Sequence, residues 1–226
     1  MISISELAAR IDHAVLKPDM TLKDLTEHAA MCMEYGVYSM CVRPCDISLA
    51  VNLLKGSNVK VSCVLSFPHG ADSTDVKAYQ ARKAIEDGAD EIDMVMNIGR
   101  FLSDEYDYVI SDIQSVVEIA HRHNVLLKVI QESCYLSPEQ IAKACELSYK
   151  SGADYVKTST GFGPGSATPG IIDIMLKTVG GRMKIKASGG IRTIEAAIAY
   201  LEQGADRLGI GSTKQILDRI ESTGTY

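Results

Sequence analysis

The sequence predicts a single (β/α)8 barrel, and three observations support that fold class. Short apolar segments typical of buried strands alternate with helical patterns along the 226 residues, as in parallel strands joined by helices. The tripeptide Gly-Ala-Asp occurs at 88–90, 152–154 and 204–206, each time after a helical pattern and before an apolar strand. Finally, three lysines are spaced equally along the chain, each at a strand end.

The three lysines are Lys128, Lys157 and Lys186, which are 29 residues apart (128 to 157, 157 to 186). One strand and one helix of a repeating β/α fold take up about that length. We therefore expect the lysines on three successive parallel strands, placed alike. A lone lysine at a strand end is most often solvated, but a lysine among buried apolar residues needs a partner or a functional reason.

Eight strands are expected in chain order: Ile11–Leu16, Tyr38–Val42, Val59–Leu65, Glu91–Met96, Leu126–Ile130, Tyr155–Lys157, Met183–Ala187 and Arg207–Ile210. Apolar spacing and start signals predict four of the intervening helices: Ser73–Asp87, Asp107–Arg122, Ser137–Lys150 and Thr193–Gln203. Proline after Ser137 is typical of a first helical turn, and Thr193 can cap its helix. A short helix, Ile4–Ala9, is expected to close the bottom of the barrel. No linker interrupts the chain, so we expect one domain, 1–226.

Composition argues against several classes of protein. A net charge of −6 and a pI near 5.4 give no support to binding of nucleic acid or of an anionic membrane. No apolar run approaches the ~18 residues of a membrane span, and residues 1–10 lack the apolar run of a signal peptide. The six cysteines form no C-x-x-C pair, so we expect no structural zinc, reduced thiols and a cytoplasmic location.

Ionisable residues within the predicted strands are the candidates for chemistry, because the active site of this fold lies at the C-terminal strand ends. They are Asp12, Asp93, Lys128, Lys157 and Lys186. A structural ion pair, for example between Asp93 and Lys128, would account for the burial of any one acid with one lysine. Three lysines against two acids, however, leave one cation short of a partner. A second ammonium about 6 Å away disfavours protonation by roughly 2–3 kcal/mol, and burial adds to this. The resulting neutral lysine can form a Schiff base, although the residues alone do not choose among the three.

Glycine-rich segments follow the last two predicted strands and indicate a phosphate site. Barrels of this class commonly bind phosphate between these two loops through backbone N–H groups. The competing interpretation is that the glycines only fit tight turns. The candidate residues of the two loops are Gly189, Gly190, Arg192, Gly209, Gly211 and Ser212.

Several stretches together resemble deoxyribose-phosphate aldolase, a family of class I aldolases, from near residue 11 to near residue 213. The matching stretches are Ile11-Asp-His, Leu16-Lys-Pro18, Phe67-Pro-His-Gly70, Glu91-Ile-Asp-Met-Val-Met-Asn-Ile-Gly99, Leu127-Lys-Val-Ile130, Val156-Lys-Thr-Ser-Thr-Gly-Phe162 and Lys186-Ala-Ser-Gly-Gly-Ile-Arg-Thr193. The last two are highly specific.

The resemblance implies a (β/α)8 lyase without cofactor or metal that cleaves 2-deoxyribose 5-phosphate to acetaldehyde and glyceraldehyde 3-phosphate. It implies that Lys157 forms the Schiff base, that Lys186 perturbs Lys157, and that Asp93 relays protons. Further candidate substrate ligands near the strand ends are Asp12, Lys128, Thr158, Thr160 and Gly161.

Three residues depart from the family pattern. Ala14 and Gly211 each lack a hydroxyl that the family usually has, and Arg43 adds a cation. Arg43 either meets a substrate phosphate or carboxylate, or is a solvated loop charge.

Three alternatives to cleavage of 2-deoxyribose 5-phosphate stay open. The first is an aldolase of the same family with another sugar phosphate as substrate. The second is a lyase that uses Lys157 only as a general acid, and the third is a phosphosugar-binding barrel without activity. A homodimer is also possible.

Overall fold

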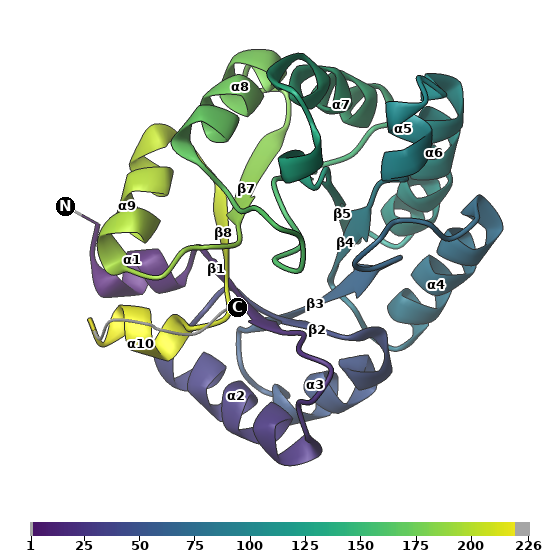
Figure 1. Cartoon of the computed structure of the whole chain (residues 1–226). Coiled ribbons are helices and arrows are strands. Elements are labelled where there is room, and N and C mark those ends of the chain that lie inside the picture. The colour runs from purple at the N-terminus through teal and green to yellow at the C-terminus, as the bar shows by residue number, and fades with distance from the viewer. Residues whose placement is uncertain (1, 220–226) are drawn as a thin grey trace.

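The structure is a computed structural model that describes residues 2–219; residues 1 and 220–226 of the predicted domain lie outside that range. Eight parallel strands pair in chain order and close into a barrel, with β8 beside β1 (Figure 1). The strands are β1 Ile11–Val15, β2 Ser39–Val42, β3 Lys60–Leu65, β4 Glu91–Val95, β5 Leu126–Ile130, β6 Tyr155–Lys157, β7 Lys184–Ser188 and β8 Arg207–Ile210. Every boundary lies within one residue of its prediction, and the predicted fold class is confirmed.

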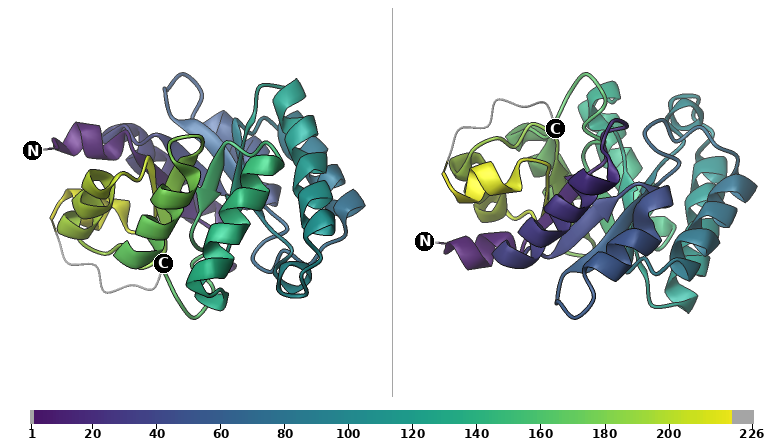
Figure 2. Two further views of the ribbon diagram at one scale, coloured as in Figure 1. Left: turned by 90° about the horizontal axis from the view of Figure 1, so that it is seen from above. Right: turned by 90° about the horizontal axis from the view of Figure 1, so that it is seen from below.

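Helices surround the barrel, as the two side views of Figure 2 show. The α-helices are α1 Ile4–Ala8, α2 Leu22–Tyr35, α3 Ile47–Leu53, α4 Thr74–Glu86, α5 Ile98–Leu102, α6 Tyr106–Arg122, α7 Pro138–Lys150, α8 Pro169–Val179, α9 Ile194–Gln203 and α10 Thr213–Leu217. Two 3₁₀ turns, η1 Pro44–Asp46 and η2 Ser133–Tyr135, follow β2 and β5. None of the helices within residues 2–219 is long and apolar enough to cross a membrane.

The predicted helix starts at Ser137 and Thr193 are confirmed. The Ser137 hydroxyl accepts a hydrogen bond from the backbone N–H of Gln140, whose side chain in turn accepts one from the Ser137 N–H. The Thr193 hydroxyl accepts from the backbone N–H of Ala196. These caps satisfy N–H groups that the first helical turn leaves without partners. Both helices therefore begin at their predicted caps.

The Gly-Ala-Asp repeat has one structural role in all three copies. Each glycine lies at the end of a helix with a left-handed backbone, at φ values of 101° for Gly88, 83° for Gly152 and 119° for Gly204. Residues with a side chain rarely adopt this conformation, so glycine is the natural residue for the turn from helix to strand. Each alanine is buried.

The aspartate of each repeat ties two neighbouring strands together. Its carboxylate accepts a hydrogen bond from a backbone N–H near the start of the preceding strand: Val61 to Asp90 at 2.9 Å, Leu127 to Asp154 at 2.8 Å and Ile185 to Asp206 at 2.9 Å. The repeat therefore ties β3 to β4, β5 to β6 and β7 to β8 at the N-terminal end of the barrel.

The main apolar core lies between the barrel wall and the helices, where outward strand residues such as Met40, Ile92 and Leu127 pack against the apolar faces of the helices. A second, smaller apolar cluster consists of Ala14, Leu16, Cys41 and Val64, with Phe67 packed against it. It lies at the C-terminal ends of β1, β2 and β3. Deeper inward positions, such as Asp12, Asp93 and Lys128, carry charged side chains.

The predicted place of the N-terminal helix is wrong. Helix α1 lies at the margin of the barrel beside α9 (Figure 1), with Leu7 and Ala8 buried. The lower end of the barrel opens into a cavity of about 220 Å³ lined by Tyr38, Tyr155 and Arg207, among others. The guanidinium of Arg207 stacks 3.3 Å from the centre of the Tyr38 ring. Side chains of the barrel itself therefore fill this end, which the helix does not cross.

We predict that Asp206→Ala lowers the free energy of unfolding by about 1–2 kcal/mol, because the Ile185 N–H then loses its side-chain partner. Asp206→Asn should cost less, since the amide oxygen can still accept. Urea denaturation measures both. The exposed Glu202→Ala on α9 is the control and should stay within about 0.5 kcal/mol of the parent. A loss for Glu202→Ala as large as that for Asp206→Ala would contradict the assigned role.

Candidate active site

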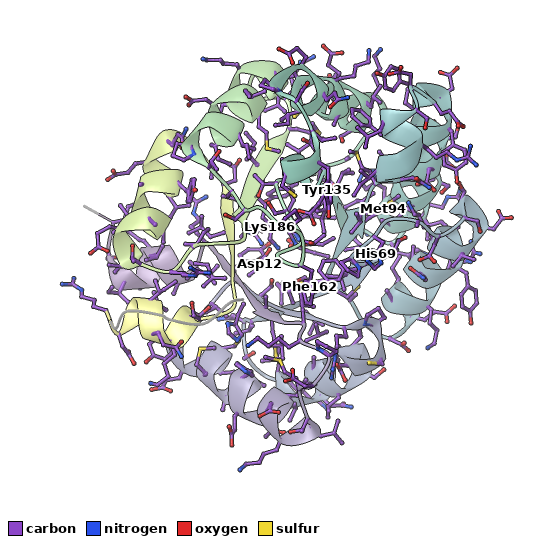
Figure 3. All side chains as sticks on the ribbon, in the orientation of Figure 1. Asp12, His69, Met94, Tyr135, Phe162 and Lys186 are labelled. Carbon is purple, nitrogen blue, oxygen red and sulfur yellow. The ribbon has the colours of Figure 1, made fainter. Side chains whose placement is uncertain are left out.

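The polar interior of the barrel is a cluster of seven charged side chains, four cations and three carboxylates, which together carry one excess positive charge. They come from β1 and from β4 to β8: Asp12, Glu91, Asp93, Lys128, Lys157, Lys186 and Arg207. All are buried. Figure 3 shows two of them, Asp12 and Lys186, near the centre of the barrel. We call these seven residues the charged interior.

Asp93 on β4 joins the three lysines. Its Oδ2 atom accepts hydrogen bonds from the Nζ atoms of both Lys157 and Lys186 at 2.7 Å, and its Oδ1 atom accepts one from Lys128 at 2.8 Å. Because one oxygen binds two amines, Lys157 and Lys186 are held side by side. Their strands agree with this, since Lys157 is directly paired with Lys186 in the register of β6 and β7.

Within residues 2–219, Lys186 has a second carboxylate partner, whereas Lys157 contacts Asp93 alone. The Nζ atom of Lys186 also donates to Asp12 Oδ2 at 2.5 Å. Asp12 is in turn held by Arg207 at 2.7 Å and by the Ser39 hydroxyl at 2.7 Å. Lys157 shares its carboxylate, Asp93, with two other cations. Of the three lysines, Lys157 therefore has the least negative charge to stabilise its protonated form.

The pKa values follow this difference. Burial lowers the pKa of Lys157, and the Lys186 cation lowers it further, against the opposing effect of Asp93. Burial would also lower the pKa of Lys186, but Asp12 and Asp93 outweigh it and raise that pKa. Burial would raise the pKa of Asp93, yet the three lysines hold it well below its usual range. Among the three lysines, Lys157 is thus the one closest to a neutral, nucleophilic amine.

The prediction that the three lysines are placed alike is wrong for Lys128. Its Cα pairs with Tyr155, two residues before Lys157, so Lys128 lies one layer deeper in the barrel. Its Nζ contacts Glu91 at 2.5 Å as well as Asp93, and these carboxylates raise its pKa well above normal despite burial. Lys128 lies beneath Lys157 and contacts both acids of β4; its assignment as a substrate ligand stays a prediction.

Asp12 also belongs to the supporting layer. Both of its carboxylate oxygens are occupied, one by Lys186 and the other by Arg207 and Ser39. It therefore has the position of a counterion to Lys186, and its assignment as a substrate ligand stays a prediction.

Two members of the charged interior were missed from the sequence. Arg207 Nη1 contacts Asp12 and, at 3.3 Å, Glu91, and its Nη2 donates to the Tyr155 hydroxyl at 3.2 Å. Both Arg207 and Glu91 are the first residues of their strands. The available signal was the two-residue strand period, since Glu91 precedes Asp93, and Arg207 precedes Gly209, by two positions. With Arg207 and Glu91 included, the cluster still has one more cation than carboxylates, as predicted.

The hydroxyls of Thr158 and Thr160, predicted as substrate ligands, have partners within the protein. The Thr158 hydroxyl donates to the Ser188 carbonyl and accepts from the Ser188 N–H, each at 3.0 Å. The Thr160 hydroxyl bonds to the Glu132 carboxylate and accepts from the Phe162 N–H at 3.0 Å. Both threonines therefore hold the loop after β6 in shape. In that loop, Gly161 has a φ of 87°.

Glu132 is a further buried acid at the mouth that the sequence did not reveal. It follows β5 in a left-handed conformation, with φ at 49°, and its carboxylate accepts from the backbone N–H of Thr160 at 3.2 Å. Burial raises its pKa, against the hydrogen bonds from Thr160 and the charge of Lys157. Glu132 thus links the loop after β5 to the loop after β6. No sequence pattern around it distinguishes it from an exposed loop acid.

The predicted phosphate-site residues do come together. Gly189, Gly190, Arg192, Gly209, Gly211 and Ser212 line one cleft with Ile191 and Ile210. Gly190 has a φ of 72°, and a Cβ at this position would lie 2.6 Å from the Ser166 hydroxyl. A Cβ at Gly209 would crowd the Ser188 hydroxyl and lie 3.3 Å from Lys186 Cε. Close approach therefore requires glycine at both positions, and turn geometry requires it at Gly190 as well.

Arg43 is tied to the loops around it. Its guanidinium donates to the carbonyls of Lys17, Pro18 and Met20 at 3.1–3.2 Å and to Asp46 at 2.6 Å. It joins the loop after β1 to the turn after β2, so most of its donors already serve these loops. Ala14, the other departure near β1, lies in the small apolar cluster of the interior.

The mouth of the barrel continues into a side cleft of about 330 Å³. Figure 3 shows His69, Tyr135 and Phe162 around this opening, and all three line the cleft together with Glu132. Phe162 meets Phe67 edge to face, with ring centroids 5.3 Å apart. Phe67 packs in turn against the apolar cluster of the interior, so the two rings join that cluster to the wall of the cleft.

The fold and the charged interior define a class of proteins, the barrel enzymes that present a perturbed lysine at the C-terminal end of a strand. Within that class, residues 7–218 match the model of the DeoC/LacD family of aldolases, and the chain belongs to this family.

Curated relatives and solved structures agree with this family. A deoxyribose-phosphate aldolase from Thermococcus gammatolerans is 49% identical over 94% of this chain and 96% of its own length. The structure of a putative deoxyribose-phosphate aldolase from Coccidioides immitis matches with a TM-score of 0.92 and 38% identity, over 96% of this chain and 86% of that one. A deoxyribose phosphate aldolase from Aeropyrum pernix, described as tetrameric, matches with a TM-score of 0.89 and 29% identity, over 96% and 91% of the two chains.

We predict that Lys186→Met moves the acidic limb of the kcat/KM–pH profile to higher pH. The pKa of Lys157 is lowered by burial and by the Lys186 cation, so removing that cation raises it, and the free amine forms only at higher pH. Lys186→Arg keeps the charge and should leave the limb near its original position. A limb that stays in place in Lys186→Met would show that Lys186 does not set the pKa of Lys157.

We predict that Asp93→Asn lowers kcat by about 10²-fold or more, because a carboxylate that contacts Lys157 Nζ can move protons and an amide cannot. Steady-state turnover and thermal melting should be measured together on the same preparation. Near-normal turnover with a lower melting temperature would assign Asp93 a purely structural role.

Proposed function

We propose that this chain reversibly cleaves 2-deoxy-D-ribose 5-phosphate to acetaldehyde and D-glyceraldehyde 3-phosphate through a Schiff base on Lys157. The observation that carries the proposal is the shared Asp93 oxygen, which contacts Lys157 and Lys186 at 2.7 Å each. This contact places the lysine with the lowered pKa beside a cation and a proton acceptor. The names of the curated relatives support the choice of substrate.

The chemistry begins with the neutral amine of Lys157, which adds to the C1 aldehyde of the open-chain sugar. Loss of the former carbonyl oxygen as water leaves a protonated imine. A base removes the proton of the C3 hydroxyl, the C2–C3 bond breaks, and its electron pair moves into the imine to form an enamine. Asp93 is the base we assign to this step, directly or through a water, because it is anionic and contacts Lys157 Nζ.

The second half returns the enzyme to its starting state. The aldehyde phosphate leaves, the enamine carbon C2 takes up a proton, and water hydrolyses the imine to release acetaldehyde. Lys186 keeps its proton through its contacts with Asp12 and Asp93. It therefore serves as a fixed positive charge that keeps Lys157 reactive in each cycle. Because the imine itself accepts the electron pair, this route uses no cofactor.

The phosphate of the substrate is assigned to the glycine-rich cleft after β7 and β8. Gly189, Gly190, Gly211 and Ser212 offer backbone N–H groups at this position, and Arg192 supplies a charge at the rim. Ser188 and Ser159 lie next to the cleft, and within residues 2–219 their buried hydroxyls have no hydrogen-bond partner in the protein. A sugar hydroxyl is the group we assign to them.

An acidic sugar in place of the deoxyribose phosphate gains no support from Arg43, whose donors already serve loop carbonyls and Asp46. A lyase without a covalent step and a binding barrel without activity both differ from the proposed enzyme in a measurable way. Neither forms an adduct that borohydride can reduce.

We also propose that the enzyme forms a homo-oligomer, with a homodimer as the expected unit, and that it works in the cytoplasm. All six cysteines are free thiols, which is typical of a reducing compartment. Light scattering on the purified protein measures the oligomeric state directly.

The test of the function is reduction of the imine. We expect borohydride with acetaldehyde to add one reduced ethyl group to the protein, and peptide mapping to find it on Lys157. Lys157→Leu should abolish the adduct. An adduct mapped to Lys128 or Lys186 would contradict the assignment, and turnover without any adduct would favour the lyase that lacks a covalent step.

The substrate is tested by comparing 2-deoxyribose 5-phosphate with unphosphorylated 2-deoxyribose. We expect the phosphorylated sugar to be cleaved with a much higher kcat/KM, because only it can use the glycine-rich cleft. Equal values for the two sugars would remove the phosphate site from the proposal while leaving the Lys157 chemistry intact.

A further inference from the structure

A buried chain of hydrogen bonds runs from α2 through β1 to the start of α10. The Nε2 atom of His13 lies 2.8 Å from His28 Nδ1 on α2, and the Nδ1 atom of His13 lies 2.8 Å from the Thr213 hydroxyl. The Thr213 hydroxyl is 3.4 Å from the Ile210 carbonyl. His13 and Thr213 are fully buried, and neither takes part in the Lys157 chemistry.

The chain is complete with one assignment of protons. The Ile210 carbonyl can only accept, so the Thr213 hydroxyl donates to it and accepts from the N–H at His13 Nδ1. His13 Nε2 then accepts from the N–H at His28 Nδ1. This requires a neutral His13, and burial, followed by the neighbouring His28, lowers the pKa of His13 to about 3. With this assignment each donor meets one acceptor.

Thr213 stands directly beside the predicted phosphate cleft. β8 ends at Ile210 and α10 begins at Thr213, so Gly211 and Ser212 alone span the connection, and both line the cleft. In the register of β1 and β8, His13 pairs with Ile210. The loop of Gly211 and Ser212 begins at Ile210 on β8 and ends at Thr213. The hydrogen bonds of Thr213 therefore hold the end of this loop against β1 and β8.

We propose that His13, acting through Thr213, is a positioning residue for phosphate binding. It holds Gly211 and Ser212 so that their backbone N–H groups face the phosphate of the substrate. This inference rests on the proposed function, because it assigns the glycine-rich cleft to that phosphate. It predicts an effect on affinity for phosphorylated substrates and none on the Lys157 chemistry, which uses side chains on the inner face of the barrel.

Two substitutions of His13 distinguish the effect of its contact with Thr213 from the effect of its contact with His28. Asn places its amide nitrogen near the position of His Nδ1, so His13→Asn keeps the donor to Thr213 and loses the bond to His28. His13→Leu loses both. We expect His13→Leu to raise the KM for 2-deoxyribose 5-phosphate by about 3- to 10-fold, as for loss of one hydrogen bond, with kcat within about twofold. His13→Asn should stay near the parent KM.

Thr213 gives an independent version of the same test, which also serves if His13→Leu does not fold. Thr213→Val should raise the KM as His13→Leu does, and Thr213→Ser should restore it. With unphosphorylated 2-deoxyribose, kcat/KM should be unchanged in all four variants. The control is Tyr35→Phe, which removes the exposed hydrogen bonds that the Tyr35 hydroxyl makes with Lys214 on α10 and with Asp218 just after it, and which should leave KM unaltered.

Three results would overturn the inference. One is an unchanged KM in both His13→Leu and Thr213→Val, while the parent enzyme still prefers the phosphorylated sugar. Another is an equal fall in kcat/KM for both sugars, which would indicate a general structural role. The third is a parent enzyme without any preference for phosphate, in which case the phosphate site of the proposed function fails first and this inference fails with it.

Discussion

The charged interior of the barrel is the constraint on which the rest of the structure depends. Four cations and three carboxylates are removed from water there, and each of the three carboxylates contacts at least two of the cations. Burying charges is costly unless they are paired. Because the cluster has one more cation than carboxylates, one amine has no carboxylate of its own. That amine belongs to Lys157, which shares Asp93 with two other lysines. Its lowered pKa is a consequence of how the whole cluster is balanced.

Such a cluster needs a rigid frame, because a shift of about an ångström would change which amine shares which oxygen. The frame is the apolar layer between barrel and helices, together with three aspartates that tie β4 to β3, β6 to β5 and β8 to β7. The strand register then decides the roles of the lysines. Lys157 and Lys186 are paired directly, whereas Lys128 pairs one layer deeper with Tyr155. Equal spacing in sequence did not mean equal height in the barrel.

The loops at the mouth are held by side-chain bonds to backbone, and so they can stay ordered without a large core of their own. Arg43 joins the loops after β1 and β2, Glu132 joins those after β5 and β6, and Thr158 joins β6 to the end of β7. The chain from His28 through His13 to Thr213 extends this pattern to the last loop. Each of these contacts links consecutive or neighbouring βα units around the ring.

The sequence by itself determined the fold class, the eight strands to within one residue, and the set of lysines and glycines around the site. Local signals carry this information: strand periodicity, helix caps such as Ser137 and Thr193, and the Gly-Ala-Asp repeat. Only the tertiary structure decided which lysine is perturbed, that Arg207 and Glu91 complete the cluster, and that Arg43 serves the loops. The physical reason is that pKa and partnership depend on distances between residues far apart in the chain, and those distances are set by the closure and stagger of the barrel.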